Sequence, residues 1–421
     1  MKAHVLVETL IGRGLESSEF LAKESLFSAV IERHAMLRPG APEHAWWVPG
    51  RLEVFGKHTD YAGGRSLVCA VPRGFAVVAS PRADGIVRVV DAFRGEDATL
   101  RPTDREPTFA GWRHYVAVAA RRLARNFRGA EFGADIVLAS DLPRASGMSS
   151  SSALVIAIAT ALGHIGKIAS RGEWKNNIRH PLAAAGYYAC IENGLGFAAL
   201  DGDAGVGTHG GSEDHAAIIE ARPGHVSAFA FVPARALGAA LVPQQWRFVL
   251  APCGVTANKT GTAREPYNRL AAEAAELLDK WNRSGGRAIS LGAALQSSPQ
   301  AAERLAAIAG PLKKRLDHFI REDARATAAL SAVAAADADA LGRMSEESQA
   351  DAEQLLGNQI PETSALARAA RKAGAFAACS FGAGFGGSVW ALVEAERAAK
   401  FAHAWHPTAF VIMPGPPLTL L

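Results

Sequence analysis

Residues 49–64 read PGRLEVFGKHTDYAGG and place several polar and aromatic side chains beside a short strand-like run. Arg51 can bind a phosphate or carboxylate group bidentately, because its guanidinium is a planar fork of donors. His58 and Asp60 lie next to a turn and are suited to binding hydroxyl groups. A solvated turn anchored by Tyr61 is the alternative interpretation. The density of polar groups beside a strand favours a binding site at this turn.

Residues 141–152 read DLPRASGMSSSS, follow a strand-like segment and precede an apolar helical pattern. Four consecutive serines, 149–152, would stand at the start of that helix. Free backbone N–H groups and the positive end of a helix attract phosphate, and hydroxyl groups can bind phosphate or a magnesium ion. Gly147 permits close approach of the backbone to a ligand. Helix capping is the alternative, but a cap needs one serine, so we favour an anion site.

Residues 380–390 read SFGAGFGGSVW and contain a G-x-G-x-x-G spacing at Gly382, Gly384 and Gly387. A dinucleotide fingerprint must follow a strand and open a helix. Here the glycines lead into SVWALV, which is a strand-like run. The spacing therefore does not predict a dinucleotide site, and a hairpin without a ligand remains equally plausible for this segment alone.

Composition excludes several classes of protein. A chain of 421 residues with 49% hydrophobic residues can form two to three domains with large cores. Lys and Arg number 45 against 41 Asp and Glu, which gives no basic footprint for nucleic acid. Four widely spaced cysteines argue against a zinc site or a disulfide framework. Neither a signal peptide nor a membrane span is expected. We expect a soluble, cytoplasmic protein without nucleic-acid or membrane partners.

Strand-like and helical segments alternate without a regular βαβ rhythm. Strand patterns occur at 66–81 and 134–140, helical patterns at 265–283 and through most of 299–357, and the final part returns to strands. This arrangement predicts an α+β fold.

The three segments together resemble the galactokinase branch of the galactokinase/homoserine kinase/mevalonate kinase/phosphomevalonate kinase (GHMP) superfamily. Residues 49–64 are similar to its sugar-binding signature, PGRVNLIGEHTDYNGG. Residues 142–153 resemble its phosphate loop, LPxGxGLSSSA, and residues 379–388 resemble its third glycine motif, RxxGGGFGG. The resemblance covers residues from about 50 to about 420 in order.

The resemblance implies two α+β domains with the active site in the cleft between them. The first, residues 1–225, would have a ribosomal protein S5-like fold and hold the sugar signature, the phosphate loop and the catalytic base. The second, residues 226–421, would be ferredoxin-like and hold the third glycine motif. The resemblance further implies transfer of the γ-phosphate of ATP to a sugar hydroxyl, in this family the anomeric one. We expect a monomer or a homodimer.

Site residues follow from the same resemblance. Asp214 lies in GSEDH, where the family has GIMDQ with its catalytic aspartate. It would accept the proton of the sugar hydroxyl, and Arg51 would neutralise charge between it and the γ-phosphate. Sugar hydroxyls would be held by Lys57, His58, Asp60 and Tyr267. ATP would be bound by Arg144, Ala145, Ser146, Gly147, Met148, Ser149, Ser150, Ser151, Gly384 and Gly386. Magnesium would be bound by Ser150 and Glu192.

Several positions depart from the family pattern. Lys57 replaces a glutamate that contacts the C6 side of the sugar, while Ala62 and Arg65 replace an asparagine and an apolar residue. A lysine donates hydrogen bonds and carries positive charge. One hypothesis is therefore an acidic acceptor, such as galacturonate or glucuronate. The alternative, of equal weight, is that Lys57 points away or pairs with Glu53.

Two further interpretations stay open at this stage. The phosphate loop has Ala145 in place of its first glycine, which leaves room for a non-catalytic relative that binds sugar and ATP as a sensor. Retention of Arg51, Asp214 and the serine run favours the enzyme. His209 and His215 lie near Asp214 without a third ligand at metal spacing, so structural or surface roles are expected for both.

Overall fold

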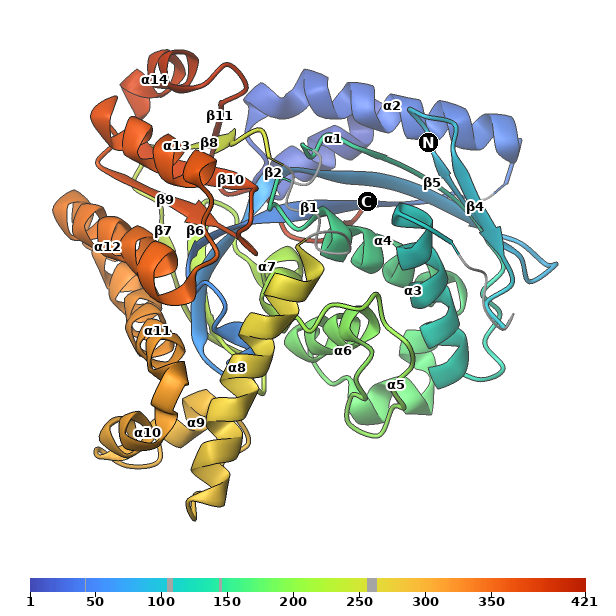
Figure 1. Cartoon of the computed structure of the whole chain (residues 1–421). Coiled ribbons are helices and arrows are strands. Elements are labelled where there is room, and N and C mark those ends of the chain that lie inside the picture. Colours follow the sequence, from blue (N-terminus) through green and yellow to red (C-terminus); the bar gives the residue numbers. More distant parts are fainter. Residues whose placement is uncertain (42, 104–108, 144–145, 256–262) are drawn as a thin grey trace.

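The computed structural model describes residues 1–41, 43–103, 109–143, 146–255 and 263–421, and these form two β-sheets with helices packed around them (Figure 1). The larger sheet has the strand order β12-β1-β2-β5-β3-β4, and β6 and β7 extend it from β2. Its neighbours are antiparallel except β3 and β5, which are parallel. Its strands are β1 (His44–Phe55), β2 (Arg65–Pro81), β3 (Val87–Asp91), β4 (Asp97–Leu100), β5 (Ala134–Ser140), β6 (His225–Ala230), β7 (Arg235–Leu241) and β12 (Thr419–Leu420).

Alternating side chains of the larger sheet supply two separate cores. Successive residues of a strand point to opposite faces. Trp46 and Val48 of β1 belong to one buried cluster, whereas Trp47, between them, belongs to another. The strands therefore read as nearly continuous apolar runs because both faces of the sheet are covered.

Different helices cover the two faces of this sheet. Helices α1 and α2 lie over one face, and α3, α4 and α6 lie on the other side (Figure 1). The helices of this part are α1 (Ala3–Gly12), α2 (Phe20–Leu37), α3 (Trp112–Asn126), α4 (Ser150–Ile165), α5 (Gly172–Asn177), α6 (Pro181–Asn193) and α7 (Glu213–Glu220).

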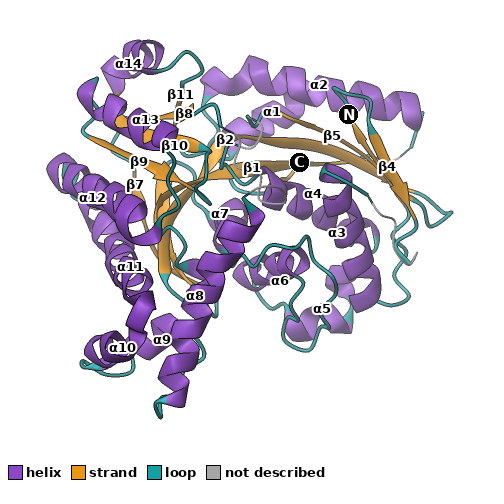
Figure 2. Ribbon diagram, in the orientation of Figure 1, coloured by secondary structure: helices purple, strands orange, loops and turns teal. Residues whose placement is uncertain are grey.

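The smaller sheet is antiparallel with the order β11-β8-β10-β9. Figure 2 shows helices gathered around it and along one side of the molecule. Its strands are β8 (Trp246–Pro252), β9 (Ala377–Phe381), β10 (Ser388–Glu394) and β11 (Phe410–Ile412). The helices of this part are α8 (Arg264–Arg283), α9 (Leu291–Leu295), α10 (Ala301–Ala309), α11 (Lys313–Ala334), α12 (Ala338–Asp351), α13 (Pro361–Lys372) and α14 (Ala398–Trp405).

The expected α+β fold is confirmed by this mixture of sheets and helices. The division of the chain at residue 225 stays a proposal, and the strand pairing bears on it. Strands β6 and β7 follow residue 225 but pair with the larger sheet, and the C-terminal β12 returns to pair with β1. The smaller sheet begins only with β8.

No helix in the described part of the chain combines the length and the apolar character that crossing a membrane would require.

Candidate active site

A cavity of about 520 Å³, a volume that includes space open to solvent, lies where the larger sheet meets helices α4, α6, α7 and α8 and the loop between β9 and β10. Its lining is mostly polar. The residues around it are Arg51, Glu53, His58, Asp60, Tyr61, Ser152, Ala189, Glu192, Asn193, Thr208, Gly210, Gly211, Glu213, Asp214, His215, Tyr267, Gly382 and Ala383.

Arg51 and Asp214 form the best-defined ion pair in the cavity. Arg51 comes from β1, and Asp214 lies in the first turn of α7, where the helix dipole favours an anion. Arg51 Nε is 2.8 Å and Nη2 is 2.7 Å from Asp214 Oδ1. Burial opposes the charge on Arg51, but Asp214 and Glu213 raise its pKa above the ordinary value, so it stays a cation. The structure thus brings the two predicted catalytic residues together.

The same arginine reaches the phosphate loop. Arg51 Nη1 donates to the backbone oxygen of Gly147 at 2.5 Å, and the backbone N–H of Arg51 donates to the backbone oxygen of Met148. The side chain of Met148 is buried in the core, so this residue faces the cavity region through its backbone alone. One guanidinium group therefore links the predicted base to the predicted phosphate loop.

Ser152 connects the carboxylates of Asp214 and Glu192. Its Oγ donates to Glu192 Oε2 at 2.7 Å and lies 3.2 Å from Asp214 Oδ2. His215 Nε2 is 3.4 Å from the same Glu192 oxygen, and both His215 and Ser152 line the cavity. Neither residue was predicted individually as a site residue: Ser152 was part of the serine run expected to bind an anion, and His215 was expected to have a structural or surface role. The run of four serines indicated a site, but the rotational position of each residue on α4 determines that Ser152 is the one that faces Glu192 and Asp214.

His58 ties the sugar-signature loop to the third glycine segment. Its Nε2 lies 3.0 Å from the backbone oxygen of Ala383, and its Nδ1 lies 2.8 Å from Tyr61 Oη. A carbonyl oxygen can only accept, so Nε2 carries the proton in this arrangement. His58 lines the cavity, and its contact with the Tyr61 hydroxyl also orients that phenol.

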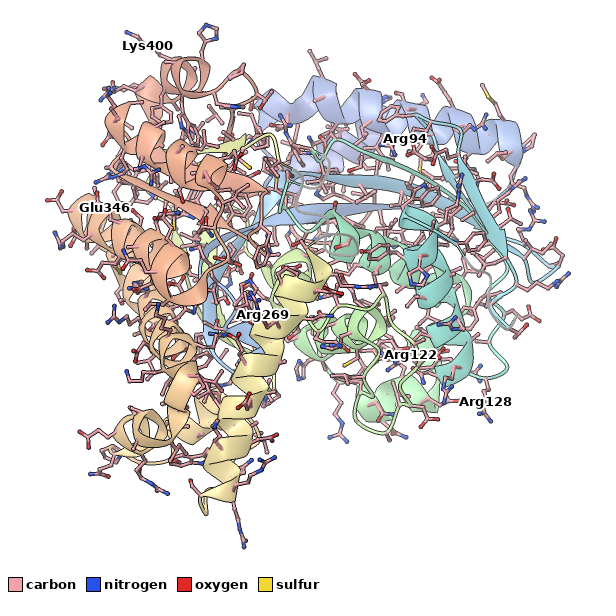
Figure 3. The ribbon with its side chains drawn as sticks, in the orientation of Figure 1. Arg94, Arg122, Arg128, Arg269, Glu346 and Lys400 are labelled. Carbon is pink, nitrogen blue, oxygen red and sulfur yellow. The ribbon has the colours of Figure 1, made fainter. Side chains whose placement is uncertain are left out.

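Asp60 and Tyr267 also line the cavity. Asp60 Oδ2 accepts from the backbone N–H of Glu213 at 3.2 Å, which ties the signature loop to the start of α7. Tyr267 is buried on α8, two residues before Arg269, which Figure 3 labels on that helix. Burial, followed by the nearby Asp60, raises the pKa of Tyr267 well above its usual range. Its phenol is therefore neutral and able to donate a hydrogen bond.

Lys57 lies elsewhere. It is fully buried, and the described residues that line the cavity do not include it. Its Nζ is 2.9 Å from Ser348 Oγ and 3.6 Å from Glu322 Oε1. The ammonium group therefore faces Ser348 and Glu322 and not the cavity in which the sugar is expected. The geometry matches the alternative in which Lys57 points away, with Glu322 as its partner instead of Glu53.

The described part of the phosphate loop packs directly against the third glycine segment. Gly147 has a φ of +77°, and a Cβ placed there would lie 3.3 Å from the oxygen of Phe381. A Cβ on Gly382 would lie 3.1 Å from the oxygen of Gly147. Ser388 Oγ donates to the oxygen of Ser146 at 2.6 Å. Glycine is therefore required here because two backbones approach closely.

The other predicted ATP-binding residues differ in their placement. Ser149 has a φ of +58°, and its buried Oγ has no hydrogen-bond partner among the described residues. Ser150 and Ser151 open α4. Gly384 packs against Asn358, since a Cβ there would overlap the Asn358 side chain, and Gly386 has a φ of +128°. The remaining two predicted residues, Arg144 and Ala145, lie outside the described residues.

Comparison with known proteins decides the family. Family models match three segments: the galactokinase galactose-binding signature at 37–81, the GHMP kinases N terminal domain at 114–180 and the GHMP kinases C terminal region at 329–411. A galactokinase of Roseiflexus sp. (strain RS-1) is 30% identical over 361 residues, which cover 84% of each chain. The chain belongs to the galactokinase family.

Other members of the galactokinase family agree with this assignment. A galactokinase of Chloroflexus aggregans is 31% identical, with 85% of each chain covered. One of Streptomyces coelicolor is 29% identical, with 88% of this chain and 90% of the relative covered. The predicted resemblance and the predicted enzyme class, an ATP-dependent sugar kinase, are therefore confirmed.

Solved structures support the fold. The crystal structure of Lactococcus lactis galactokinase complexed with galactose has a TM-score of 0.77 at 22% identity, covering 94% of this chain and 99% of that one. Methanococcus jannaschii mevalonate kinase has a TM-score of 0.54 at 14% identity, covering 90% and 99%. The predicted two-domain GHMP kinase fold is confirmed.

Proposed function

We propose that this protein transfers the γ-phosphate of ATP to the anomeric hydroxyl of galactose or a closely related neutral sugar. The observation that carries the proposal is the position of Asp214. Its carboxylate lies between Arg51, which also bonds the phosphate loop, and Ser152, and it borders a cavity walled by the sugar-signature loop. Phosphoryl transfer needs mainly such positioning and charge stabilisation.

Asp214 would accept the proton of the attacking hydroxyl or orient its oxygen toward the phosphate. Arg51 holds that carboxylate through two N–H groups on one oxygen. As a permanent cation beside the phosphate loop, it would also offset charge that develops on the transferred phosphoryl group. Asp60, Tyr267 and His58 would bind sugar hydroxyls, since a carboxylate accepts and a neutral phenol donates.

ATP and magnesium fit the described donors. The orphaned Oγ of Ser149, at the positive end of α4, is the kind of donor that a phosphate oxygen satisfies. Magnesium prefers oxygen ligands and takes one or two carboxylates together with substrate phosphates. Glu192, whose carboxylate borders the cavity, and Ser150 would hold it. The bound ion would neutralise charge on the phosphates.

The charge of the cavity favours a neutral acceptor over a uronate. Among the described residues that line it, five are Asp or Glu, and Arg51 is the one Lys or Arg. The hypothesis of an acidic acceptor required the Lys57 ammonium, which faces Glu322 and Ser348 instead. A sugar carboxylate would therefore meet more negative than positive charge.

ADP release with magnesium-ATP against a panel of sugars tests the proposal. The panel contains galactose, N-acetylgalactosamine, glucose, arabinose, fucose, galacturonate and glucuronate. We expect turnover with galactose or a close neutral relative, lost in Asp214→Ala and kept in Asp201→Ala, which removes an exposed aspartate. ATP binding without turnover of any sugar would favour the sensor, and preferred turnover of a uronate would contradict the neutral acceptor.

A further inference from the structure

Two buried glutamates lie beside the proposed catalytic residues Arg51 and Asp214, and the proposed reaction assigns no role to either glutamate. Glu53 on β1 is 3% exposed and Glu213 at the start of α7 is 4% exposed. Their side chains lie within hydrogen-bonding reach of each other. Both line the cavity beside Arg51. Two buried carboxyl groups in contact thus meet directly next to the proposed reaction centre.

Each of the two carboxyl groups accepts a hydrogen bond from a residue outside the pair. Ser66 Oγ donates to Glu213 Oε2 at 2.5 Å, and the backbone N–H of Gly382 points to Glu53 Oε1 at 3.4 Å. Arg51 Nε lies 3.5 Å from Glu213 Oε1. Between the two glutamates themselves there is no donor unless one of them is protonated. Carboxylates in contact resolve their repulsion by sharing one proton.

Burial and the neighbouring carboxylates oppose ionisation of both glutamates, whereas the positive charges of Arg51 and Lys57 only partly offset them. Asp60 and Asp214 add negative charge on the cavity side. Next to Asp214, Glu192 contacts His215, and Lys57 is already paired with Glu322. Burial, and then the neighbouring Glu53, raises the pKa of Glu213 well above its usual range, and burial also raises the pKa of Glu53.

We propose that Glu53 and Glu213 share a single proton and, as a pair with one negative charge, act as positioning residues that hold Arg51 against Asp214. The proposal rests on the proposed function, because it assigns Arg51 its place in the transfer. The pair would hold the Arg51 side chain through its Nε, while Nη1 stays bonded to the oxygen of Gly147 in the phosphate loop. Loss of the shared proton at alkaline pH would add a second negative charge next to the γ-phosphate site.

Infrared spectroscopy of the whole protein without ligands tests the shared proton directly. We expect a protonated-carboxyl band at neutral pH that shifts in D2O and disappears in Glu53→Gln and in Glu213→Gln. Glu396→Gln, which removes an exposed glutamate, is the control and leaves the band in place. A band that persists in both pair variants, or one missing from the parent protein, would overturn the proposal. This measurement needs no turnover, so it stands apart from the test of the kinase.

Kinetics tests the positioning role. A glutamine amide can replace the shared proton by donating to the remaining carboxylate, whereas leucine cannot. We expect Glu53→Leu to lower kcat by about tenfold to a hundredfold relative to Glu53→Gln, with little change in either KM, since a misplaced catalytic group costs rate. We also expect the kcat of the parent to decline at alkaline pH, when the shared proton is lost, and this decline should move or vanish in Glu53→Gln. Equal kcat in the two variants, with an unchanged pH profile, would contradict the role.

Discussion

Lys57 and Glu322 form a fully buried ion pair that joins the sugar-signature loop to helix α11. Lys57 Nζ is 3.6 Å from Glu322 Oε1, and that oxygen also accepts from the backbone N–H of Gly56 at 3.0 Å. Ser348 completes the group with its hydroxyl 2.9 Å from Lys57 Nζ. The lysine that replaces the family's glutamate is therefore matched by a carboxylate from a distant helix.

Removing one member of this pair should be costly. Lys57→Met removes one of two cations beside the buried Glu322 and leaves Arg325, 2.9 Å from Glu322 Oε2, as the other. We therefore expect a loss of about 3 kcal/mol, at the lower end of the range for breaking a buried ion pair. The double variant Lys57→Met/Glu322→Gln should recover a large part of this loss, because a neutral amide costs less to bury. Urea unfolding of the parent, both single variants and the double variant measures the coupling as a double-mutant cycle.

The same cycle has a functional control. Neither residue is among the described residues that line the cavity, so the double variant should keep the sugar preference of the parent. A change from neutral sugars toward uronates, or the reverse, would show that Lys57 reaches the acceptor after all.

The contribution of Glu322 to stability should depend on pH in a defined direction. Burial opposes its ionisation, but the positive charges of Lys57 and Arg325 lower the pKa of Glu322 to about 2, from an ordinary value of 4.5. A lowered carboxyl pKa stabilises the folded protein above the unfolded value, and this contribution declines as pH falls from about 4.5 toward about 2. Its size is about 3 kcal/mol.

Urea unfolding at several pH values, from neutral down to about pH 3, checks this sign. The free energy of unfolding of the parent should fall on acidification more steeply than that of Lys57→Met/Glu322→Gln, which lacks the titrating carboxylate. Parallel curves for the two proteins would mean that Glu322 has an ordinary pKa.

Gly211 sets the position of Asp60. A Cβ on Gly211 would overlap Asp60 Oδ2 and would lie 2.7 Å from the backbone nitrogen of Tyr61. Gly211→Ala should therefore push the Asp60 carboxylate away from the sugar and raise the KM for sugar by about tenfold, while the KM for ATP changes little. Gly172→Ala is the matched control, because a Cβ there meets no described atom within 4 Å. Equal changes in both KM values would point to a general loss of structure.

The sequence was sufficient to predict which segments meet, but not how every side chain is directed. Gly147 was predicted to allow close backbone approach, and the structure shows that Gly382 is one of its partners in this contact. The direction of Lys57 could not be predicted, because its partner Glu322 lies 265 residues later on another helix. Neither could the role of Ser152, since packing of α4 fixes which hydroxyl faces Glu192. Helices α1 and α2, which cover one face of the larger sheet, were also not predicted.

Arg51 offers the sharpest test of how the site is assembled. Its guanidinium makes two N–H contacts to Asp214 Oδ1 and one to the oxygen of Gly147, so three donors of one rigid group connect the base and the phosphate loop. Lysine carries the same charge on a single nitrogen and cannot reproduce this fork. Arg51→Lys should lower kcat by about a hundredfold or more. Arg65→Lys is the matched control, because Arg65 pairs with Asp323 and is not among the described cavity residues. Steady-state ADP release, together with calorimetry of ATP binding to exclude a simple loss of folding, measures both variants. If Arg51→Lys turned over as fast as Arg65→Lys, charge alone would be sufficient and the three-point geometry would not matter to the transfer.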